Sequence, residues 1–224
     1  MDLNRKEIYR YLGYKGTAPD ETVSAVVEDS IVELLRVMRP KFVSRPVTIT
    51  RPSENIVLLD TIEVHSKSLY QHLDTCSEGV LLAATLGASV DMLIHRYNVM
   101  GMSRAVILQA CAAAAIERVC DDHQGEIEEQ AKAKGLFLRP RFSPGYGDFP
   151  ISGQPEFLRL TGAEKKIGLT VTDTCILVPR KSVTAVCGIA DHPVTGTLAG
   201  CATCALRETC KRRKEGIPCG TFDS

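Results

Sequence analysis

The chain lacks an excess of charge of either sign. Its 224 residues include 27 basic and 27 acidic side chains, so the formal net charge at pH 7 is zero. Because the net charge is zero, the composition indicates no overall electrostatic attraction to nucleic acid or to a membrane surface. No apolar run approaches the ~20 residues that a membrane-spanning helix needs. The opening Met1-Asp-Leu-Asn-Arg-Lys-Glu lacks the apolar core of a signal peptide, so we expect a cytoplasmic protein.

Two further absences narrow the class of protein. The strand-like run 79–87 precedes a helical pattern, yet the glycine fingerprint of a dinucleotide-binding turn is missing, and no such site is predicted. The nine cysteines are an odd number and are not spread as in a small secreted disulfide scaffold. We therefore expect thiols that are reduced or bound to metal.

Hydrophobic spacing predicts a chain of mixed helices and strands. Residues 1–40 and 103–134 have helical periodicity. Residues 42–50 and 56–59 are rich in β-forming side chains, and the run 79–87 is apolar enough for a central strand. The pattern predicts an α+β fold, with a twisted, mainly antiparallel sheet, surrounding helices and a cysteine-rich appendage at the C-terminus.

Finer predictions concern the second half of the chain. Ser103 is expected to cap a helix, and Gly125 is expected to interrupt it. Residues 156–166 are predicted to form one short helix. The β-rich runs 169–178 and 182–189 are predicted to pair as a hairpin.

The most informative stretch is Arg139-Pro-Arg-Phe-Ser-Pro-Gly-Tyr-Gly-Asp-Phe-Pro150. Its prolines and glycines exclude a regular helix or an inner strand, so it is predicted to be an irregular loop. Arg141 has the forked donors that grip a carboxylate or phosphate, and Gly145 would let the backbone approach a ligand closely. The alternative is a buried crossing loop whose aromatic side chains only pack.

The tail is the second informative stretch, with four cysteines at Cys201, Cys204, Cys210 and Cys219. The two-residue gap between the first pair lets both sulfurs bind one metal, and the other two complete a four-thiolate site. The tail has too few large apolar residues for a core, so its order would come from a metal or a partner. Zinc and an iron–sulfur cluster both suit four sulfurs. The alternative is a flexible tail with reactive thiols or a redox pair.

The loop carries a resemblance to a known family. Arg141-Phe-Ser-Pro-Gly-Tyr146 is similar to the Arg-x-x-Pro-Gly-Tyr signature that holds S-adenosylmethionine in the activation (reactivation) domain of cobalamin-dependent methionine synthase. Further matches follow in the family's order, at Ala83-Ala-Thr-Leu-Gly87, Ile116-Glu-Arg-Val119, Ile167-Gly-Leu-Thr170 and Asp191-His-Pro193.

The match covers roughly residues 75–195, and the chain resembles the free-standing, short form of this domain. Residues 8–14 and the cysteine tail are similar to the short relatives alone. The resemblance therefore divides the chain into an activation-domain-like part, residues 1–195, whose first 40 residues are helical, and a metal-binding tail, residues 196–224.

The resemblance implies a part in the reductive repair of a corrinoid. In such systems cobalt(I) is occasionally oxidised to cobalt(II), and S-adenosylmethionine is presented so that one-electron reduction is coupled to methyl transfer onto cobalt. The protein would then be an accessory component rather than a stand-alone catalyst. Cobalamin would sit on the partner methionine synthase or another corrinoid protein, and a flavodoxin- or ferredoxin-like protein would be the reductant.

The resemblance also implies roles for single residues of the loop. Arg141 would clamp the methionine carboxylate, and the backbone around Pro144 and Gly145 would lie along the ligand. Tyr146 would contact the adenosine. No side chain need act as acid, base or nucleophile, because the sulfonium is already a methyl donor and positioning is the protein's contribution.

Three positions depart from the family pattern. The longer members use an acid on the long helix, where alignment places Gln109 in this chain. They also have two aromatic residues before the His-Pro pair, where this chain has Ile189 and Ala190. Gln109 can hydrogen-bond but cannot offset the charge of the ligand's amino group, and the two aliphatic residues cannot stack on a ring. An N-terminal acid used by the family has no identified counterpart.

A second function, of a different class, stays open. The protein would be a metal-cluster electron-transfer or adaptor protein for a corrinoid methyltransferase, with iron–sulfur or zinc at the tail cysteines. Residues 139–150 would then be structural only. The two functions can also coexist, if a cluster in the tail delivers the electron that reactivation needs.

Overall fold

A computed structural model describes residues 1–14 and 18–193 of the chain. Its centre is a six-stranded sheet in the order β3-β2-β1-β4-β8-β5, in which every neighbouring pair is antiparallel. The predicted α+β class is therefore confirmed, while the predicted cysteine-rich appendage lies outside the described residues. The strands are β1 (Lys41–Ser53), β2 (Ile56–Leu59), β3 (Ile62–His65), β4 (Glu78–Thr85), β5 (Phe137–Leu138) and β8 (Ser182–Ala190).

Strand β4 lies near the middle of the sheet because its side chains are apolar on both faces. Leu81 and Ala83 pack toward one face, and Leu82 and Ala84 pack toward the other, since successive side chains of a strand alternate. A strand buried on both sides has a continuous apolar run rather than an alternating one. This run is the signal from which the sequence predicted a central strand.

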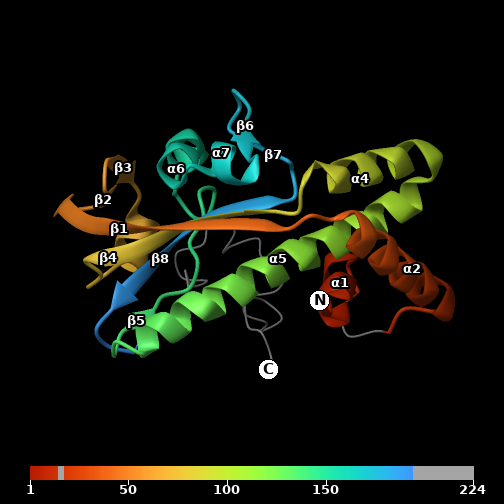
Figure 1. Cartoon of the computed structure of the whole chain (residues 1–224), viewed down its shortest axis with the longest axis horizontal. Helices are drawn as coiled ribbons and strands as arrows, with labels where there is room; N and C mark the ends of the chain where they lie inside the picture. The colour runs from red at the N-terminus through yellow and green to blue at the C-terminus, as the bar shows by residue number, and fades with distance from the viewer. Residues whose placement is uncertain (15–17, 194–224) are drawn as a thin grey trace, which may run out of the picture.

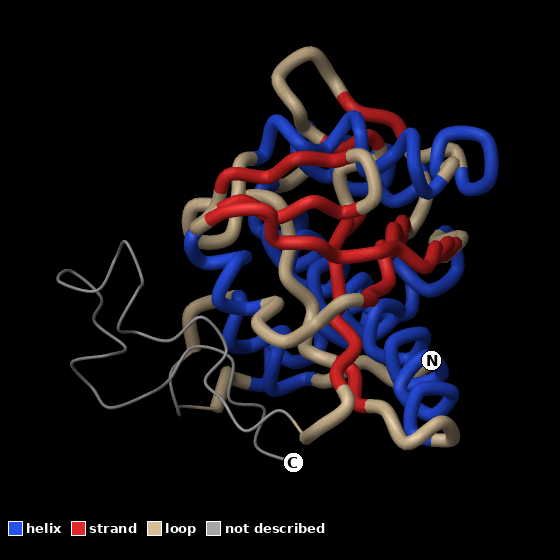
Figure 2. The backbone as a smooth tube through the Cα atoms, turned by 90° about the vertical axis from the view of Figure 1, so that its left-hand side faces the viewer, coloured by secondary structure: helices blue, strands red, loops and turns tan. Residues whose placement is uncertain are grey.

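Helices cover both faces of the sheet, and Figure 2 shows the strands as a layer with helices on either side. In Figure 1 the long helix α5 runs obliquely under the sheet, while α6 and α7 lie on the opposite face. Helices α1 and α2 pack with α4 against the first half of α5. The helices are α1 (Arg5–Tyr11), α2 (Glu21–Val37), α3 (Lys67–His72), α4 (Ala88–Met100), α5 (Met102–Lys132), α6 (Gln154–Thr161) and α7 (Ala163–Ile167). The other short elements are η1 (Ile151–Gly153), β6 (Thr170–Val171) and β7 (Leu177–Val178).

Helix α5 continues through the glycine that was expected to break it. Gly125 lies inside the helix, because a single glycine costs about 1 kcal/mol and the flanking turns keep their hydrogen bonds. The helix begins at Met102 after Gly101, and no side chain caps it, so the predicted cap at Ser103 is wrong. No helix within residues 1–14 and 18–193 is long and apolar enough to cross a membrane.

The region after α5 also differs from its predicted form. Residues 169–178 turn back on themselves at Cys175, which has φ +62°, and form the β6–β7 pair. Strand β8 instead pairs with β4 and β5, so the predicted hairpin is wrong because long-range pairing replaces it. The predicted helix at 156–166 is two helices, since Gly162 has φ +66° and reverses the chain between them.

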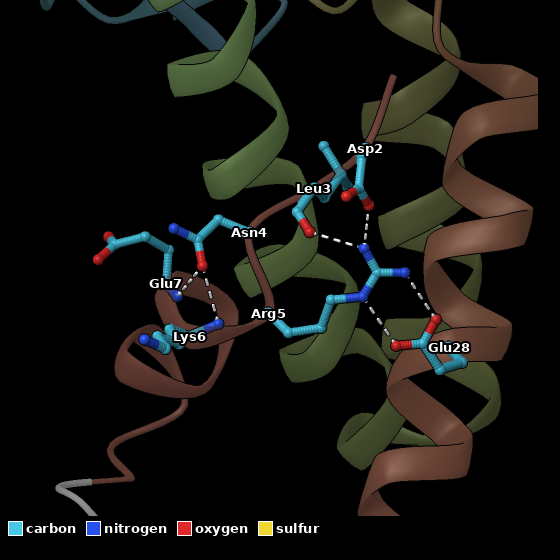
Figure 3. Close-up of polar contacts among 7 residues, drawn as sticks. All are labelled: Asp2, Leu3, Asn4, Arg5, Lys6, Glu7 and Glu28. Carbon is cyan, nitrogen blue, oxygen red and sulfur yellow. Dashed lines mark hydrogen bonds and ion pairs between the residues drawn. The ribbon is translucent and has the colours of Figure 1, made fainter. Parts of the chain in front are cut away.

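The N-terminal segment is fixed against α2 by the guanidinium of Arg5 (Figure 3). Its Nε and Nη2 each donate to one carboxylate oxygen of Glu28 at 3.0 Å, and its Nη1 donates to the carbonyl of Leu3 at 2.8 Å. The Asn4 side chain accepts two backbone N–H groups and caps α1. Together with buried Leu3 and Ile8, this two-pronged contact holds α1 beside α5.

Two glycines differ in their surroundings: one is closely packed and the other borders open space. Substituting each by alanine gives a paired test of the fold. A Cβ at Gly79 in β4 would lie 2.7 Å from the carbonyl oxygen of Cys187, whereas one at Gly125 in α5 would meet nothing within 4 Å. We predict that Gly79→Ala lowers the free energy of unfolding by about 1–3 kcal/mol, because the backbone of β8 would have to move. Gly125→Ala should raise it by about 0.5–1 kcal/mol through helix propensity. Urea unfolding of both variants measures the difference, and equal effects would contradict the described register.

Candidate functional site

The loop 139–150 follows a fixed course across the edge of the sheet. The backbone of Phe142 exchanges two hydrogen bonds with Val186 of β8, each 2.9 Å long. Further on, the amide of Gly145 donates to the carbonyl of Phe149 at 2.8 Å. Gly145 has φ +96°, a conformation that residues with a Cβ rarely adopt. These bonds fix the turn that carries Pro144 and Tyr146.

The loop's aromatic residues divide between packing and exposure. Phe142 and Phe149 are each 2% exposed and lie with ring centroids 6.2 Å apart, and Phe149 also packs against Phe157 of α6. Tyr146 is 57% exposed and points its ring edge at Phe142. The packing alternative thus describes the two phenylalanines, and Tyr146 is left at the surface.

His72 of α3 supports the first part of the loop. Its Nε2 lies 2.9 Å from the carbonyl oxygen of Pro140, and its ring packs against Phe142 with centroids 4.8 Å apart. Because a carbonyl oxygen only accepts, Nε2 carries the proton and donates it. Burial lowers the pKa of His72, with a smaller lowering from the charge of Arg139, so the ring is neutral at pH 7.

Asp148 ties the end of the loop to the start of α3. Its Oδ1 accepts from the Ser66 hydroxyl at 2.6 Å and from the amide of Ser68 at 3.0 Å, and its Oδ2 accepts from the amide of Lys67 at 2.8 Å. Burial acts to raise the pKa of this carboxyl, but the hydrogen bonds from Ser66 and the helix amides lower it to about 2. The loop is thereby clamped at both ends by contacts to α3.

A cavity of about 770 Å³ opens beside the loop. Its walls come from five parts of the chain: the start of the chain with α1, the middle of α5, the loop itself, Gln154 at the start of α6, and the β7–β8 region. This volume falls within the range of small-molecule sites, roughly 300–1,000 Å³. The predicted residues that line it are Arg141, Pro144 and Tyr146.

Arg141 lies at the junction of the loop and α5, with its side chain 14% exposed. Its Nη1 donates to Gln124 Oε1 at 2.8 Å, and its Nη2 donates to Glu117 Oε2 at 3.0 Å and Asp121 Oδ1 at 2.7 Å. Burial acts to lower the pKa of Arg141, but the hydrogen bond to Asp121 and the two nearby carboxylates leave it raised. The guanidinium is therefore always charged, and a ligand carboxylate would have to share or replace one of these acceptors.

The rest of the cavity wall adds two tyrosine rings and an ion pair on α1. Tyr11 of α1 and Tyr146 of the loop both line it. The pKa values of both phenols are raised, first because each ring lies partly within the wall although its surface is exposed, and next by the charge of Glu117, which lines the same cavity. Glu7 and Arg10 of α1 also line the cavity and form an ion pair with each other. The site thus offers an arginine, acids and two phenol rings within one opening.

Three predicted positions lie elsewhere. Gln109 is exposed on α5, and its backbone carbonyl accepts from Lys181 Nζ at 3.1 Å. Ile189 and Ala190 are the last residues of β8 and pair with β5, whereas the cavity is lined by the first residues of that strand. Ile189 lines a second cavity of about 380 Å³, and Ala190 is buried. The structure does not bring these three residues to the 770 Å³ cavity.

Three buried thiols of the described residues are suited to packing. Burial raises the pKa values of Cys111, Cys120 and Cys187 to about 12, so each is a neutral thiol at pH 7 rather than a metal-binding thiolate. Within residues 1–14 and 18–193, no group of three or more histidine, cysteine or acidic side chains could hold a metal ion. The predicted ligands Cys201, Cys204, Cys210 and Cys219 lie outside the described residues.

Sequence reasoning missed the partners of Arg141 and the wall made by α1. Glu117, Asp121 and Gln124 are spaced four and three residues apart, so they share one face of the helix. This polar stripe directly follows the alanine-rich stretch and was the available signal. The contribution of Tyr11 had no local signal, because it depends on how α1 packs against α5.

With this geometry in place, the chain can be compared with known proteins. Its structure is similar to the crystal structure of the MetH reactivation domain bound to AdoHcy, with TM-score 0.64 and 13% sequence identity. The match covers 96% of this chain and 82% of that chain. The two share a fold. The predicted resemblance to a reactivation domain is thus confirmed for the fold, and identity this low shows nothing further. No protein-family model and no curated protein matches the chain.

The Asp148 clamp gives a test with a defined pH dependence. We predict that Asp148→Asn lowers the free energy of unfolding at pH 7 by about 1–2 kcal/mol, a figure reduced for the exposure of this side chain. Because the folded pKa is about 2, below the ordinary 3.8, the contribution is complete above that ordinary value and is lost as the pH falls through 2. Urea unfolding of both proteins at pH 7 and pH 2 measures this, and a gap that stays constant would contradict it.

Proposed function

We propose that the 770 Å³ cavity binds S-adenosylmethionine and that the protein is a reactivation subunit of a corrinoid methyltransferase, with cobalamin-dependent methionine synthase as the expected partner. The single observation that carries this proposal is the position of Arg141, which lines a ligand-sized cavity from within the Arg-x-x-Pro-Gly-Tyr loop. The fold shared with the AdoHcy-bound MetH reactivation domain supports it.

The charges on the cavity wall suit the amino-acid end of such a ligand. An α-amino acid is a zwitterion, and it needs a forked cation for its carboxylate and an anion for its ammonium group. Arg141 supplies the first, and Glu117 and Asp121 supply the second within one hydrogen-bonded cluster. The ligand's carboxylate would take over a guanidinium nitrogen that these acids now share.

The aromatic side chains suit the adenosine end. Tyr11 and Tyr146 line the cavity from different elements, and each offers a ring face or edge and a hydroxyl. Pro144 and Gly145 shape the backbone between Arg141 and Tyr146, and the glycine leaves open space beside it. The loop would therefore hold both ends of the ligand on one rigid segment.

The reaction that this binding would serve consists of one electron transfer to the partner's cobalt and one methyl transfer from S-adenosylmethionine to it. Cobalt(II) on the partner takes one electron from a flavodoxin- or ferredoxin-like reductant and becomes cobalt(I). Cobalt(I) then attacks the methyl carbon; the carbon–sulfur bond breaks, its electron pair stays on sulfur, and methylcobalt(III) and S-adenosylhomocysteine form. The chain's own contribution is to orient the sulfonium methyl group toward the partner and to hold the amino-acid end.

We predict that the purified protein binds S-adenosylmethionine and that Arg141→Ala weakens binding by at least about tenfold, because a charge-assisted hydrogen bond to the carboxylate is lost. Arg141→Lys should lose less, since it keeps the charge without the fork. Isothermal titration calorimetry measures all three proteins.

Arg159→Ala is the matched control, because Arg159 is exposed, pairs with Glu156 and does not line the cavity. Its affinity should equal that of the wild type. The same variants should rank in the same order when methylcobalamin formation is followed spectroscopically with the corrinoid partner and a reductant. Tight binding that Arg141→Ala leaves unchanged would contradict the proposed function.

A metal centre at Cys201, Cys204, Cys210 and Cys219 remains a prediction from the sequence, and with it the alternative function in electron transfer. If the four thiolates bind one ion or cluster, anaerobically purified protein should contain zinc or iron in a fixed ratio to protein. A Cys204→Ser variant should lose most of it, and Cys175→Ser, a change in the β6–β7 turn, should not. Elemental analysis of the three proteins measures their zinc and iron content. Metal-free protein that still supports methylcobalamin formation would contradict a role for a metal cluster in electron transfer.

A further inference from the structure

The ion pairs around the cavity leave one negative charge in excess. Glu7 pairs with Arg10 on α1, and on α5 Arg118 donates to Asp122 at 2.7 Å, so both of these lining arginines are neutralised locally. Arg141 is different, because its single positive charge meets both Glu117 and Asp121. Three acids and three arginines line the cavity, but Arg118 is paired with Asp122, which does not line it. The ion pairs that include a lining residue therefore contain four acids and three arginines, and the excess acid belongs to the Arg141 cluster.

This excess charge complements one of two closely related ligands. S-adenosylmethionine carries a carboxylate, an ammonium group and a sulfonium, and its net charge is positive. Methyl transfer turns the sulfonium into a neutral thioether, so S-adenosylhomocysteine is a zwitterion without net charge. A cavity with one unbalanced carboxylate attracts the first ligand more strongly than the second.

We propose that Asp121 makes the site prefer the sulfonium ligand to its thioether product; this inference rests on the proposed function. Of the two acids on Arg141, Asp121 is the more exposed, with 49% of its side chain accessible against 36% for Glu117. It has the shorter side chain and shares Nη2 with Glu117, while Gln124 occupies Nη1. A ligand carboxylate therefore replaces Asp121 at the lowest cost in desolvation, and the released aspartate stays charged at the cavity wall.

The preference has a consequence for turnover. Once the methyl group leaves, the ligand loses its positive charge while the wall keeps its negative one. The product is then held less tightly than the substrate, and it leaves for the next S-adenosylmethionine. A half-exposed carboxylate at the cavity wall is worth roughly a three- to tenfold difference in affinity for a ligand with one more positive charge, since water screens it.

The test is the ratio of two dissociation constants, measured by isothermal titration calorimetry with S-adenosylmethionine and S-adenosylhomocysteine. The wild type should favour S-adenosylmethionine by roughly three- to tenfold, and Asp121→Asn should bring the ratio to within about twofold of unity. Glu129→Gln is the matched control, because it removes one acid from the same helix at an exposed position outside the cavity. It should keep the wild-type ratio.

The ratio cancels every effect that the two ligands share, including lost competition for Arg141 and any change in folding. An Asp121→Asn ratio equal to that of the wild type would overturn the inference and leave the proposed function intact. A ratio that Glu129→Gln changes as much as Asp121→Asn does would also overturn it, because the effect would belong to the net charge of the protein. Binding of neither ligand by the wild type would overturn the inference and the proposed function together.

Discussion

The structure around the cavity depends on the contact between Arg141 and the carboxylates of α5. A proline- and glycine-rich loop has no ladder of hydrogen bonds of its own, so its position must come from contacts elsewhere. Arg141 fastens the first part of the loop to Glu117 and Asp121, and Asp148 fastens its end to the start of α3. Both clamps are charge-assisted, and one of them lies at the edge of a cavity. The contact that orders the loop is thus also the one that a ligand carboxylate would enter.

The sheet and the helices packed on it place Arg141 next to Glu117 and Asp121. The central strands are apolar on both faces and accept helices on each side, so the second half of α5 can cross one face while its first half packs against α1, α2 and α4. Small side chains on α5 allow α1 and α2 to pack closely against it, and the bidentate pair of Arg5 and Glu28 fixes the first turn of α1 against α2. Tyr11 reaches the cavity for that reason. A site assembled from the first and the middle parts of the chain therefore depends on helix packing rather than on any local motif.

The parts of the fold with local signals could be predicted from the sequence. The run 79–87 was recognised as a central strand because it is apolar, and β4 covers it as far as Thr85. Residues 139–150 form a loop because their prolines and glycines interrupt helix and strand. Local sequence patterns gave wrong predictions where contacts between distant parts of the chain determine the structure. Strand β8 pairs with β4 instead of with the strand that precedes it in the sequence, and helix α5 continues through Gly125 because its packing stabilises it. Of the residues predicted for the site, Arg141 lines the cavity and was predicted from its motif. Gln109 lies exposed on α5 and does not line the cavity, because the periodicity of a long helix does not reveal which of its turns faces the loop.

The most direct measurement is a crystal structure of the protein with bound S-adenosylmethionine. The account predicts the ligand in the cavity between α1, α5 and the loop, with its carboxylate on the Arg141 guanidinium and Asp121 displaced from Nη2. A ligand bound elsewhere, with Arg141 still hydrogen-bonded to both Glu117 and Asp121, would contradict the account.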